Sequence, residues 1–310
     1  MNLSVKQALK KHGVNAREAI AAEFQQLNSR KVWRAIHSSK SASHSKHKKI
    51  LPCSMFLKEK FNAHGVFEKL KARLVAGGHR TETSLYSSSE TSSPTVAFET
   101  LMLVLSIAAF EERDAEAIDF PGAYLYAILK EKQLMKIGPE LADIAIHVNP
   151  ELEKYQQQDR SILVEIDKAL YGLPESAKLW FDHLSKFLIS IGYVQSTSDP
   201  CLFNKEKYGD KSTLCIHVDD VLHTYTGKRL RSELSRHLKK EFKELKIQDT
   251  KDGNISYLGM VLSFSKQKRS ISLSMPAYTK EIIKKRNASA RRKKVFSKLT
   301  IYIRPLLNIY

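Results

Sequence analysis

Two adjacent carboxylates, Asp219 and Asp220, stand between two short runs of mostly apolar residues that favour β-strands, at 214–218 and 221–223. A two-residue connection between such strands is a hairpin turn, so the pattern predicts that both aspartates lie at its tip. Aspartate is disfavoured in strands and neighbouring like charges repel, so a bound cation is the usual compensation. The alternative is a solvated turn, which an Asp-Asp pair by itself favours.

A third carboxylate, Asp119, lies in a short predicted strand over residues 117–120, which Pro121 and Gly122 terminate. Pairing of this strand with the hairpin would gather three carboxylates, and oxygen ligands suit Mg²⁺. Two such ions about 4 Å apart can activate a primer 3′-hydroxyl and stabilise the leaving pyrophosphate. Asp119 and the hairpin therefore predict a site for metal-dependent nucleotidyl transfer.

The charge balance indicates a polyanionic partner. The 310-residue chain carries 51 Lys and Arg against 33 Asp and Glu, a formal net charge of +18. Such an excess suits nucleic acid or an anionic membrane surface. The three cysteines, Cys53, Cys201 and Cys215, are widely spaced, which argues against a zinc ribbon and a disulfide framework and fits a reducing compartment.

No membrane segment or secretory signal is expected. The most apolar run, residues 101–110, has half the length of about 20 residues that a bilayer span requires, so it predicts a core helix. The first residues contain no apolar core of a signal peptide.

The apolar periodicity predicts alternating helices and strands. The expected helices cover residues 5–28, 95–112, 174–192 and 228–246. The expected strands cover residues 54–57, 71–76, 117–120, 161–166, 255–264 and 270–274, together with the hairpin at 213–225. Residues 38–49 and 81–94 read as polar loops. This order indicates an α+β fold, an antiparallel sheet with helices packed on one face.

Several blocks, in the expected order, give the chain a resemblance to the reverse transcriptase region of copia-type LTR retrotransposon polyproteins. They cover residues 71–79 (KARLVAGGH), 92–96 (SSPTV), 118–125 (IDFPGAYL), 168–180 (KALYGLPESAKLW), 198–203 (SDPCLF), the Val-Asp-Asp hairpin and 257–260 (YLGM). The resemblance implies the palm and fingers of a right-hand polymerase. It divides the chain into a helical lead-in (1–30), fingers and palm (31–275), and a truncated thumb region with a basic divergent tail (276–310).

The resemblance also implies roles for individual residues. The catalytic, metal-binding set would be Asp119, Asp219 and Asp220, with the carbonyl of Phe120 as a further metal ligand. The nucleotide-binding set would be Lys71, Arg73, Phe120, Tyr124, Glu175 and Ser176. The primer-positioning set would be Tyr257, Leu258, Gly259 and Met260. Tyr124 would crowd the sugar 2′ position and so favour deoxynucleotides. The residues by themselves leave alternatives open, because Tyr124 reads equally as core and Lys71 and Arg73 as a solvated strand face.

The implied cofactor is a pair of Mg²⁺ ions, with Mn²⁺ as a substitute. The implied partners are an RNA template, a DNA or RNA primer and deoxynucleoside triphosphates, without a membrane. The protease, integrase and ribonuclease H of such a polyprotein are expected to be missing from this chain. The expected location is a cytoplasmic virus-like particle, with the nucleus as the other compartment.

Three residues depart from the family pattern. His217 replaces the usual Tyr before Val-Asp-Asp, Pro121 replaces a polar residue, and Glu175 replaces a frequent Gln. They motivate an alternative, a degenerate and catalytically inactive nucleic-acid-binding remnant. A third hypothesis, a metal-dependent nuclease, leaves the matches at Lys71, Arg73 and Tyr124 unexplained.

Overall fold

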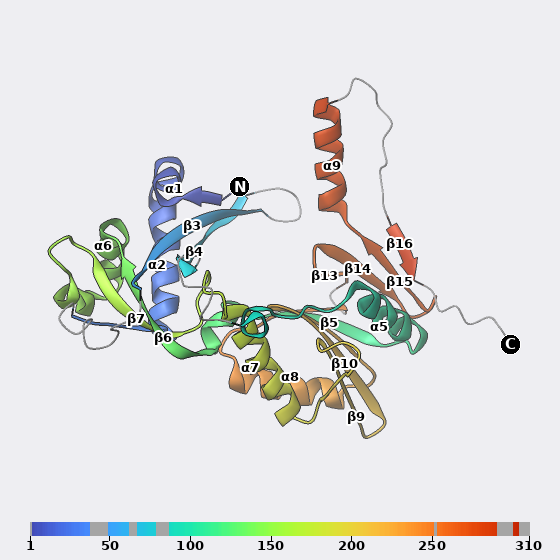
Figure 1. Cartoon of the computed structure of the whole chain (residues 1–310). Helices are drawn as coiled ribbons and strands as arrows, with labels where there is room; N and C mark the ends of the chain where they lie inside the picture. The colour runs from blue at the N-terminus through green and yellow to red at the C-terminus, as the bar shows by residue number, and fades with distance from the viewer. Residues whose placement is uncertain are drawn as a thin grey trace. The chain divides into compact units, whose positions relative to one another are not determined.

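The structure, a computed structural model, describes residues 2–37, 49–61, 67–78, 87–250, 253–289 and 300–303. The chain forms two compact units, each built from separate stretches of sequence (Figure 1). Unit 1 comprises Met1–Ser93 and Gly122–His183, and unit 2 comprises Pro94–Pro121 and Leu184–Tyr310. Both combine helices with mostly antiparallel strands, which confirms the predicted α+β class. Most of the predicted loop at 38–49 and much of the basic tail lie outside the described residues.

Unit 1 is built around one mixed sheet. Its strands are β1 (Asn2–Ser4), β2 (Trp33–Ala35), β3 (Leu51–Phe61), β4 (Phe67–Ala76), β6 (Ile128–Ile137) and β7 (Ile162–Lys168). Its helices are α1 (Val5–His12), α2 (Val14–Ser29), α4 (Ser88–Thr91), η3 (Ala123–Tyr126), α6 (Pro139–Val148) and η4 (Pro150–Tyr155). The strand order is β1-β3-β6-β7-β2, and β4 pairs with β3.

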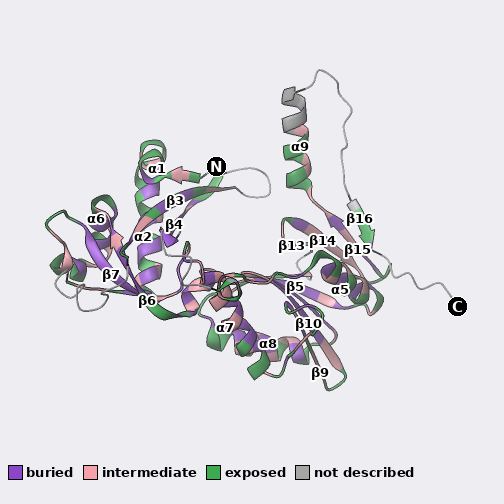
Figure 2. Cartoon of the chain, viewed as in Figure 1, coloured by how far each residue is buried: buried purple, intermediate pink, exposed green. Residues whose placement is uncertain are grey.

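The long β3–β4 ribbon has one apolar and one polar face. Along β4, Ala72, Leu74 and Ala76 are buried and join one core with the apolar side of α2, whereas the intervening Lys71 and Arg73 lie on the other face (Figure 2). This period-2 alternation is what a half-buried strand requires, and it confirms the strand predicted at 71–76.

The helix predicted over residues 5–28 is in fact two helices. Gly13 separates α1 from α2 with a φ of +51°, a left-handed value that glycine adopts without steric cost. Ser4 caps α1 by accepting a hydrogen bond from the backbone N–H of Gln7. The apolar periodicity continues across the break, so the pattern alone could not reveal it.

Unit 2 contains two antiparallel sheets. The strands of the first are β5 (Asp114–Asp119), β8 (Val194–Gln195), β9 (Leu202–Lys207), β10 (Asp210–His217), β11 (Asp220–Tyr225) and β12 (Lys246–Asp249). Those of the second are β13 (Ile255–Tyr257), β14 (Met260–Ser265), β15 (Ser270–Ser274) and β16 (Thr300–Ile303). The first sheet has the order β12-β5-β11-β10-β9-β8 and the second the order β13-β14-β15-β16.

The helices of unit 2 are α5 (Phe98–Phe110), α8 (Arg229–Glu241) and α9 (Pro276–Ser289), and α7 (Ser176–Ser190) contributes to both units. The helices predicted at 95–112, 174–192 and 228–246 correspond to α5, α7 and α8. Within the described residues, no helix is both long and apolar enough to cross a bilayer.

Candidate active site

The central strands of unit 2 bring the predicted carboxylates together. In the β5–β11 ladder Asp119 is directly opposite Asp220. The backbone N–H of Phe120 donates a hydrogen bond to the carbonyl oxygen of Asp219 at 3.1 Å, which ties the end of β5 to the β10–β11 turn. Residues one hundred positions apart in the sequence therefore meet at one end of this sheet.

The predicted position of both aspartates at the hairpin tip was wrong by one residue. His217 pairs with Asp220, so the two-residue turn consists of Val218 and Asp219, and Asp220 is the first residue of β11. The cause is the pairing of β11 with β5 on its other edge, which extends the strand through Asp220. Val218 has a φ of +58°. A β-branched residue is strained there, and a positive φ at the first turn position is typical of a type II′ turn, which favours glycine.

His217, beside this turn, is partly buried. Burial lowers the pKa of its imidazole, against the opposing effect of Asp219, so the ring is neutral at pH 7. Its Nδ1 atom is buried and has no hydrogen-bond partner among the described residues. The histidine thus adds no positive charge to the aspartate pair at that pH.

Negative charge accumulates where the three carboxylates meet. Burial, followed by the charges of Asp219 and Asp119, raises the pKa of Asp220 to about 6. The Lys246 ammonium lies 3.7 Å from a carboxylate oxygen of Asp119 and offsets part of this charge. Among the described residues, no group of three or more His, Cys, Asp or Glu side chains is already gathered closely enough to hold a metal ion.

The Phe120 side chain is a packing residue of the core. It is 1% exposed and packs edge-on against Phe242, with ring centroids 4.9 Å apart. The aromatic ring therefore belongs to the core of unit 2, and only the Phe120 backbone is near the aspartates.

The four residues predicted to position the primer form a tight hairpin. Tyr257 and Met260 end β13 and begin β14, and the turn residues Leu258 and Gly259 both have positive φ, the pattern of a type I′ turn. Tyr257 is buried, and its hydroxyl donates to the carbonyl oxygen of Cys215 at 3.2 Å. The tyrosine therefore anchors this hairpin to β10, the strand that leads to Val218 and Asp219.

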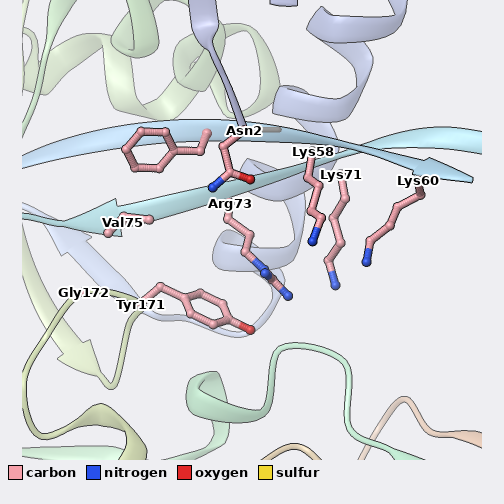
Figure 3. A pocket seen from close by; sticks show the side chains of 9 residues that line it. Asn2, Lys58, Lys60, Lys71, Arg73, Val75, Tyr171 and Gly172 are labelled. Atoms are coloured by element: carbon pink, nitrogen blue, oxygen red, sulfur yellow. The ribbon is translucent and has the colours of Figure 1, made fainter. Parts of the chain in front are cut away.

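Unit 1 carries a separate, cationic cavity of about 310 Å³ on the polar face of β3–β4. Lys71 and Arg73, the predicted triphosphate contacts, both line it, and Lys58 is directly opposite Lys71. Figure 3 shows Lys58, Lys60, Lys71 and Arg73 projecting from the same side of the ribbon. Four positive side chains gather here, and no carboxylate is among the described residues of the lining.

Tyr171 forms the opposite wall of this cavity and was missed in the sequence. Its ring lies 5.0 Å from the Arg73 guanidinium, a cation–π contact (Figure 3). The backbone holds it there: Ala76 N–H donates to the Tyr171 carbonyl oxygen at 2.8 Å, and Gly172 has a φ of +91°. A Cβ on Gly172 would lie 2.1 Å from the Ala76 oxygen, so only glycine allows this close approach.

The remaining predicted nucleotide contacts lie close to this wall. The Tyr124 ring lies 4.8 Å from that of Tyr171, and Tyr124 also packs against the core of unit 1. Ser176 is 1% exposed, and its hydroxyl both donates to the Leu170 carbonyl and accepts from the Leu170 N–H. Ser176 therefore closes the 170–176 loop, and the adjacent Glu175 begins α7's first turn by accepting from Leu179 N–H.

Comparison with known proteins identifies the family. The family model described as "Reverse transcriptase (RNA-dependent DNA polymerase)" matches residues 31–297. The chain belongs to this reverse transcriptase family. It is 29% identical over 57% of its length to the retrovirus-related Pol polyprotein from transposon RE1 of Arabidopsis thaliana. It is 25% identical over 87% of its length to the corresponding polyprotein from transposon TNT 1-94 of Nicotiana tabacum. Both relatives are retrovirus-related Pol polyproteins from transposons, and they support the resemblance that the sequence blocks carry.

The chain spans only 11% of the RE1 polyprotein and 19% of the TNT 1-94 polyprotein. Among solved structures, apo telomerase from Candida tropicalis, truncated from its C-terminal domain, aligns with a TM-score of 0.37 and 9% identity. That alignment covers 74% of this chain and 57% of the telomerase chain. Likeness at this level adds nothing to the family assignment.

Proposed function

We propose that this reverse transcriptase region catalyses RNA-directed DNA synthesis, with unit 2 as the palm and part of unit 1 as the fingers of a right-hand polymerase. The observation that carries the proposal is the register of β5 and β11, which places Asp119 opposite Asp220 and next to the turn that holds Asp219. The reaction transfers a deoxynucleotide from its triphosphate to a primer 3′-hydroxyl and releases pyrophosphate.

The donor set fits divalent magnesium. Asp119, Asp219 and Asp220 supply only oxygen ligands, and burial followed by the charges of the other two aspartates raises the pKa of Asp220. With the Phe120 carbonyl, these carboxylates would hold Mg²⁺, or Mn²⁺ in its place. Bound as a pair, such ions would activate the 3′-hydroxyl and stabilise the pyrophosphate.

The cationic cavity of unit 1 is our candidate for the triphosphate site. Lys58, Lys60, Lys71 and Arg73 line it, and charge-assisted hydrogen bonds from such groups neutralise phosphate oxygens. We assign discrimination against ribonucleotides to Tyr124, whose ring rests beside Tyr171. Glu175 and Ser176 contribute to nucleotide binding indirectly, through the loop that places Tyr171 in the cavity wall.

The β13–β14 hairpin is our candidate for the primer-positioning element. Leu258 and Gly259 form its accessible tip, while Tyr257 and Met260 are buried beneath it. A primer strand would therefore meet the turn backbone, and Tyr257 would set the height of that turn above β10.

The proposed partners follow from the family and the charge. An RNA template and a DNA or RNA primer suit a chain of net charge +18. The protease, integrase and ribonuclease H would come from elsewhere in a longer polyprotein, and the proposed compartment is a cytoplasmic virus-like particle, with the nucleus as the alternative. The domain boundaries at residues 30 and 275 remain predictions.

Primer extension on an RNA template tests the proposal. We expect Mg²⁺-dependent extension that Asp219→Asn lowers by about 100-fold or more, because it removes a metal ligand. Asp143→Asn, which breaks an exposed ion pair with Arg160, is the matched control and should leave extension unchanged.

A second candidate function is nucleic-acid binding without catalysis, favoured by the His217, Pro121 and Glu175 departures. A folded, Mg²⁺-loaded protein that binds primer–template but does not extend it would establish this candidate and reject the first. Binding would then be salt-sensitive and indifferent to Asp219→Asn.

A further inference from the structure

A chain of buried polar groups crosses the same sheet three residues away from the aspartates. His223 Nδ1 lies 2.9 Å from the Glu116 carboxylate, and His223 Nε2 lies 2.8 Å from the Ser212 hydroxyl, which lies 2.6 Å from the Tyr193 hydroxyl. Glu116, Ser212 and His223 are each at most 1% exposed. No substrate can reach Ser212, so this Ser-His-Glu chain is not a hydrolytic site.

The Glu116 end of this series of hydrogen bonds is fixed by an arginine from α8. Arg231 Nε donates to Glu116, and its terminal nitrogen donates to Asp249, both at 2.9 Å. Although burial raises it, the hydrogen bonds from His223 and Arg231 hold the pKa of Glu116 below its ordinary value. Removal of one partner would leave a buried charge without compensation.

Glu116, His223 and Asp249 share a single rung of the sheet. Glu116 is directly opposite His223 on one side and Asp249 on the other. Asp119, three residues along β5, is likewise opposite Asp220 and Lys246. Because side chains alternate between faces, the two polar rungs project from opposite faces of the sheet.

A one-residue slip between β5 and β11 would transfer every side chain of the slipped strand to the other face. It would part Asp119 from Asp220, and it would part Glu116 from His223. The two rungs between them are apolar, Ile118 with Val221 and Ala117 with Leu222, and these residues are buried on both faces of the sheet, so the alternation of apolar side chains does not by itself select one register. Register therefore depends on the polar rung.

We propose that Glu116 and His223, clamped by Arg231, are positioning residues that hold β5 and β11 in the one register that aligns the metal-binding aspartates. The inference rests on the proposed function for the purpose of that alignment. Buried polar pairs that set register have precedent in other folds, where apolar replacements keep the stability but lose the specificity.

Disulfide trapping measures the register directly. Ala115 and Thr224 are opposite each other in the native ladder, so Ala115→Cys with Thr224→Cys should cross-link on mild oxidation. After a one-residue slip the two thiols would project from opposite faces and could not join. We expect near-complete cross-linking in the otherwise native chain and about fivefold less when Glu116→Leu and His223→Leu are added.

Mn²⁺ binding, measured by calorimetry without substrate, gives the second readout. Glu116→Leu with His223→Leu should weaken Mn²⁺ affinity about tenfold while keeping the melting temperature, because the pair is replaced by packed apolar groups. Glu116→Gln in the otherwise native protein retains a hydrogen-bonding side chain beside His223, so it should cross-link as fully as the native sequence. Tyr193→Phe removes the hydrogen bond to Ser212, which lies outside the β5–β11 ladder. This variant is the control and should change neither readout.

Unchanged cross-linking and Mn²⁺ affinity in a folded double-leucine variant would overturn the inference. If the double variant does not fold, Arg231→Met, at a partly exposed position, is measured in its place. It should lower both the cross-linking and the Mn²⁺ affinity, because it removes the arginine that fixes Glu116. Native protein that cross-links fully but binds no Mn²⁺ would refute the proposed metal site alone, because trapping requires neither metal nor activity.

Discussion

Asp220 is the residue on which the electrostatics of the candidate site converge. Its partial burial, and after that the charges of Asp219 and Asp119, raise its pKa to about 6. A carboxylate in the unfolded chain titrates near pH 4. The folded state therefore holds a proton at Asp220 over a pH range in which the unfolded state has released it, and this difference links stability to pH.

The first prediction concerns this linkage. Because the pKa of Asp220 is raised on folding, its ionisation costs stability, which is lost as pH rises from about 4 through 6. In EDTA at pH 7.5, Asp220→Asn should increase the free energy of unfolding by about 1–2 kcal/mol, a value reduced for solvent screening, and have little effect at pH 4.5. Urea unfolding at both pH values measures it.

Added Mg²⁺ should reverse the order of stability of the native protein and Asp220→Asn. An ion that binds only the folded protein stabilises it, so added Mg²⁺ should raise the melting temperature of the native protein but not that of Asp220→Asn. Asp143→Asn, at an exposed ion pair, should shift stability by less than about 0.5 kcal/mol. A destabilised Asp220→Asn at pH 7.5 would contradict the proposed repulsion.

The second prediction concerns backbone strain at Val218. Its φ of +58° costs an L-residue about 1–2 kcal/mol, and glycine relieves this cost but loses about 0.5–1 kcal/mol in the unfolded state. Val218→Gly should therefore stabilise the protein by about 0.5–1 kcal/mol in thermal unfolding. It should also lower primer extension, because the freed turn no longer fixes Asp219.

The matched control is Tyr208→Gly, at a φ of +59° in the β9–β10 hairpin. It relieves comparable strain away from the aspartates, so it should raise stability without changing extension. Equal effects of both substitutions on extension would show that strain at Val218 has no special role.

At the scale of elements, the cationic cavity depends on how closely a loop approaches β4. The carbonyl of Tyr171 accepts from Ala76, Gly172 passes within contact of the same residue, and a Cβ on Gly78 would lie 2.1 Å from the Gly172 oxygen. Two glycines from distant parts of the chain thus allow the crossing that places Tyr171 against Arg73.

The third prediction tests that crossing. Gly172→Ala combines a φ of +91° with a backbone clash at 2.1 Å, so it should destabilise unit 1 by about 2–4 kcal/mol in chemical unfolding. Gly138→Ala is the control, since a Cβ there has nothing within 4 Å, and it should change stability by less than about 1 kcal/mol. A neutral Gly172→Ala would mean that the crossing is looser than described.

At the scale of the whole molecule, the dominant property is the net charge of +18. Cations that neutralise phosphates release bound counterions, which makes affinity depend steeply on salt. The charge acts on any nucleic acid, so it explains association and not sequence choice.

The fourth prediction follows from that charge. Primer–template binding, measured by fluorescence anisotropy, should weaken by about 10³- to 10⁵-fold between 50 and 200 mM salt if six to ten phosphates are contacted. In EDTA, Asp219→Asn should bind primer–template with the same salt slope, because the substitution removes no Lys or Arg side chain that neutralises a phosphate. A slope near zero would exclude an electrostatic interface.

The sequence by itself determined the strands and helices with a strong period, the three candidate aspartates and the family. These properties are local: alternation in residues 71–76 and the Asp-Asp pair between apolar runs can be read within a short window. The predicted break-free helix over 5–28 failed for the same reason, because an apolar period does not report the dihedral angles of Gly13.

Only the tertiary structure decided which residues meet. The pairing of β11 with β5 moved Asp220 from the turn into a strand, and the crossing at Gly172 brought Tyr171 to Arg73. The rung of Glu116 and His223 joins residues 107 positions apart. Such partners are chosen by long-range packing and by the register of paired strands, and no short window of sequence contains both members of a pair.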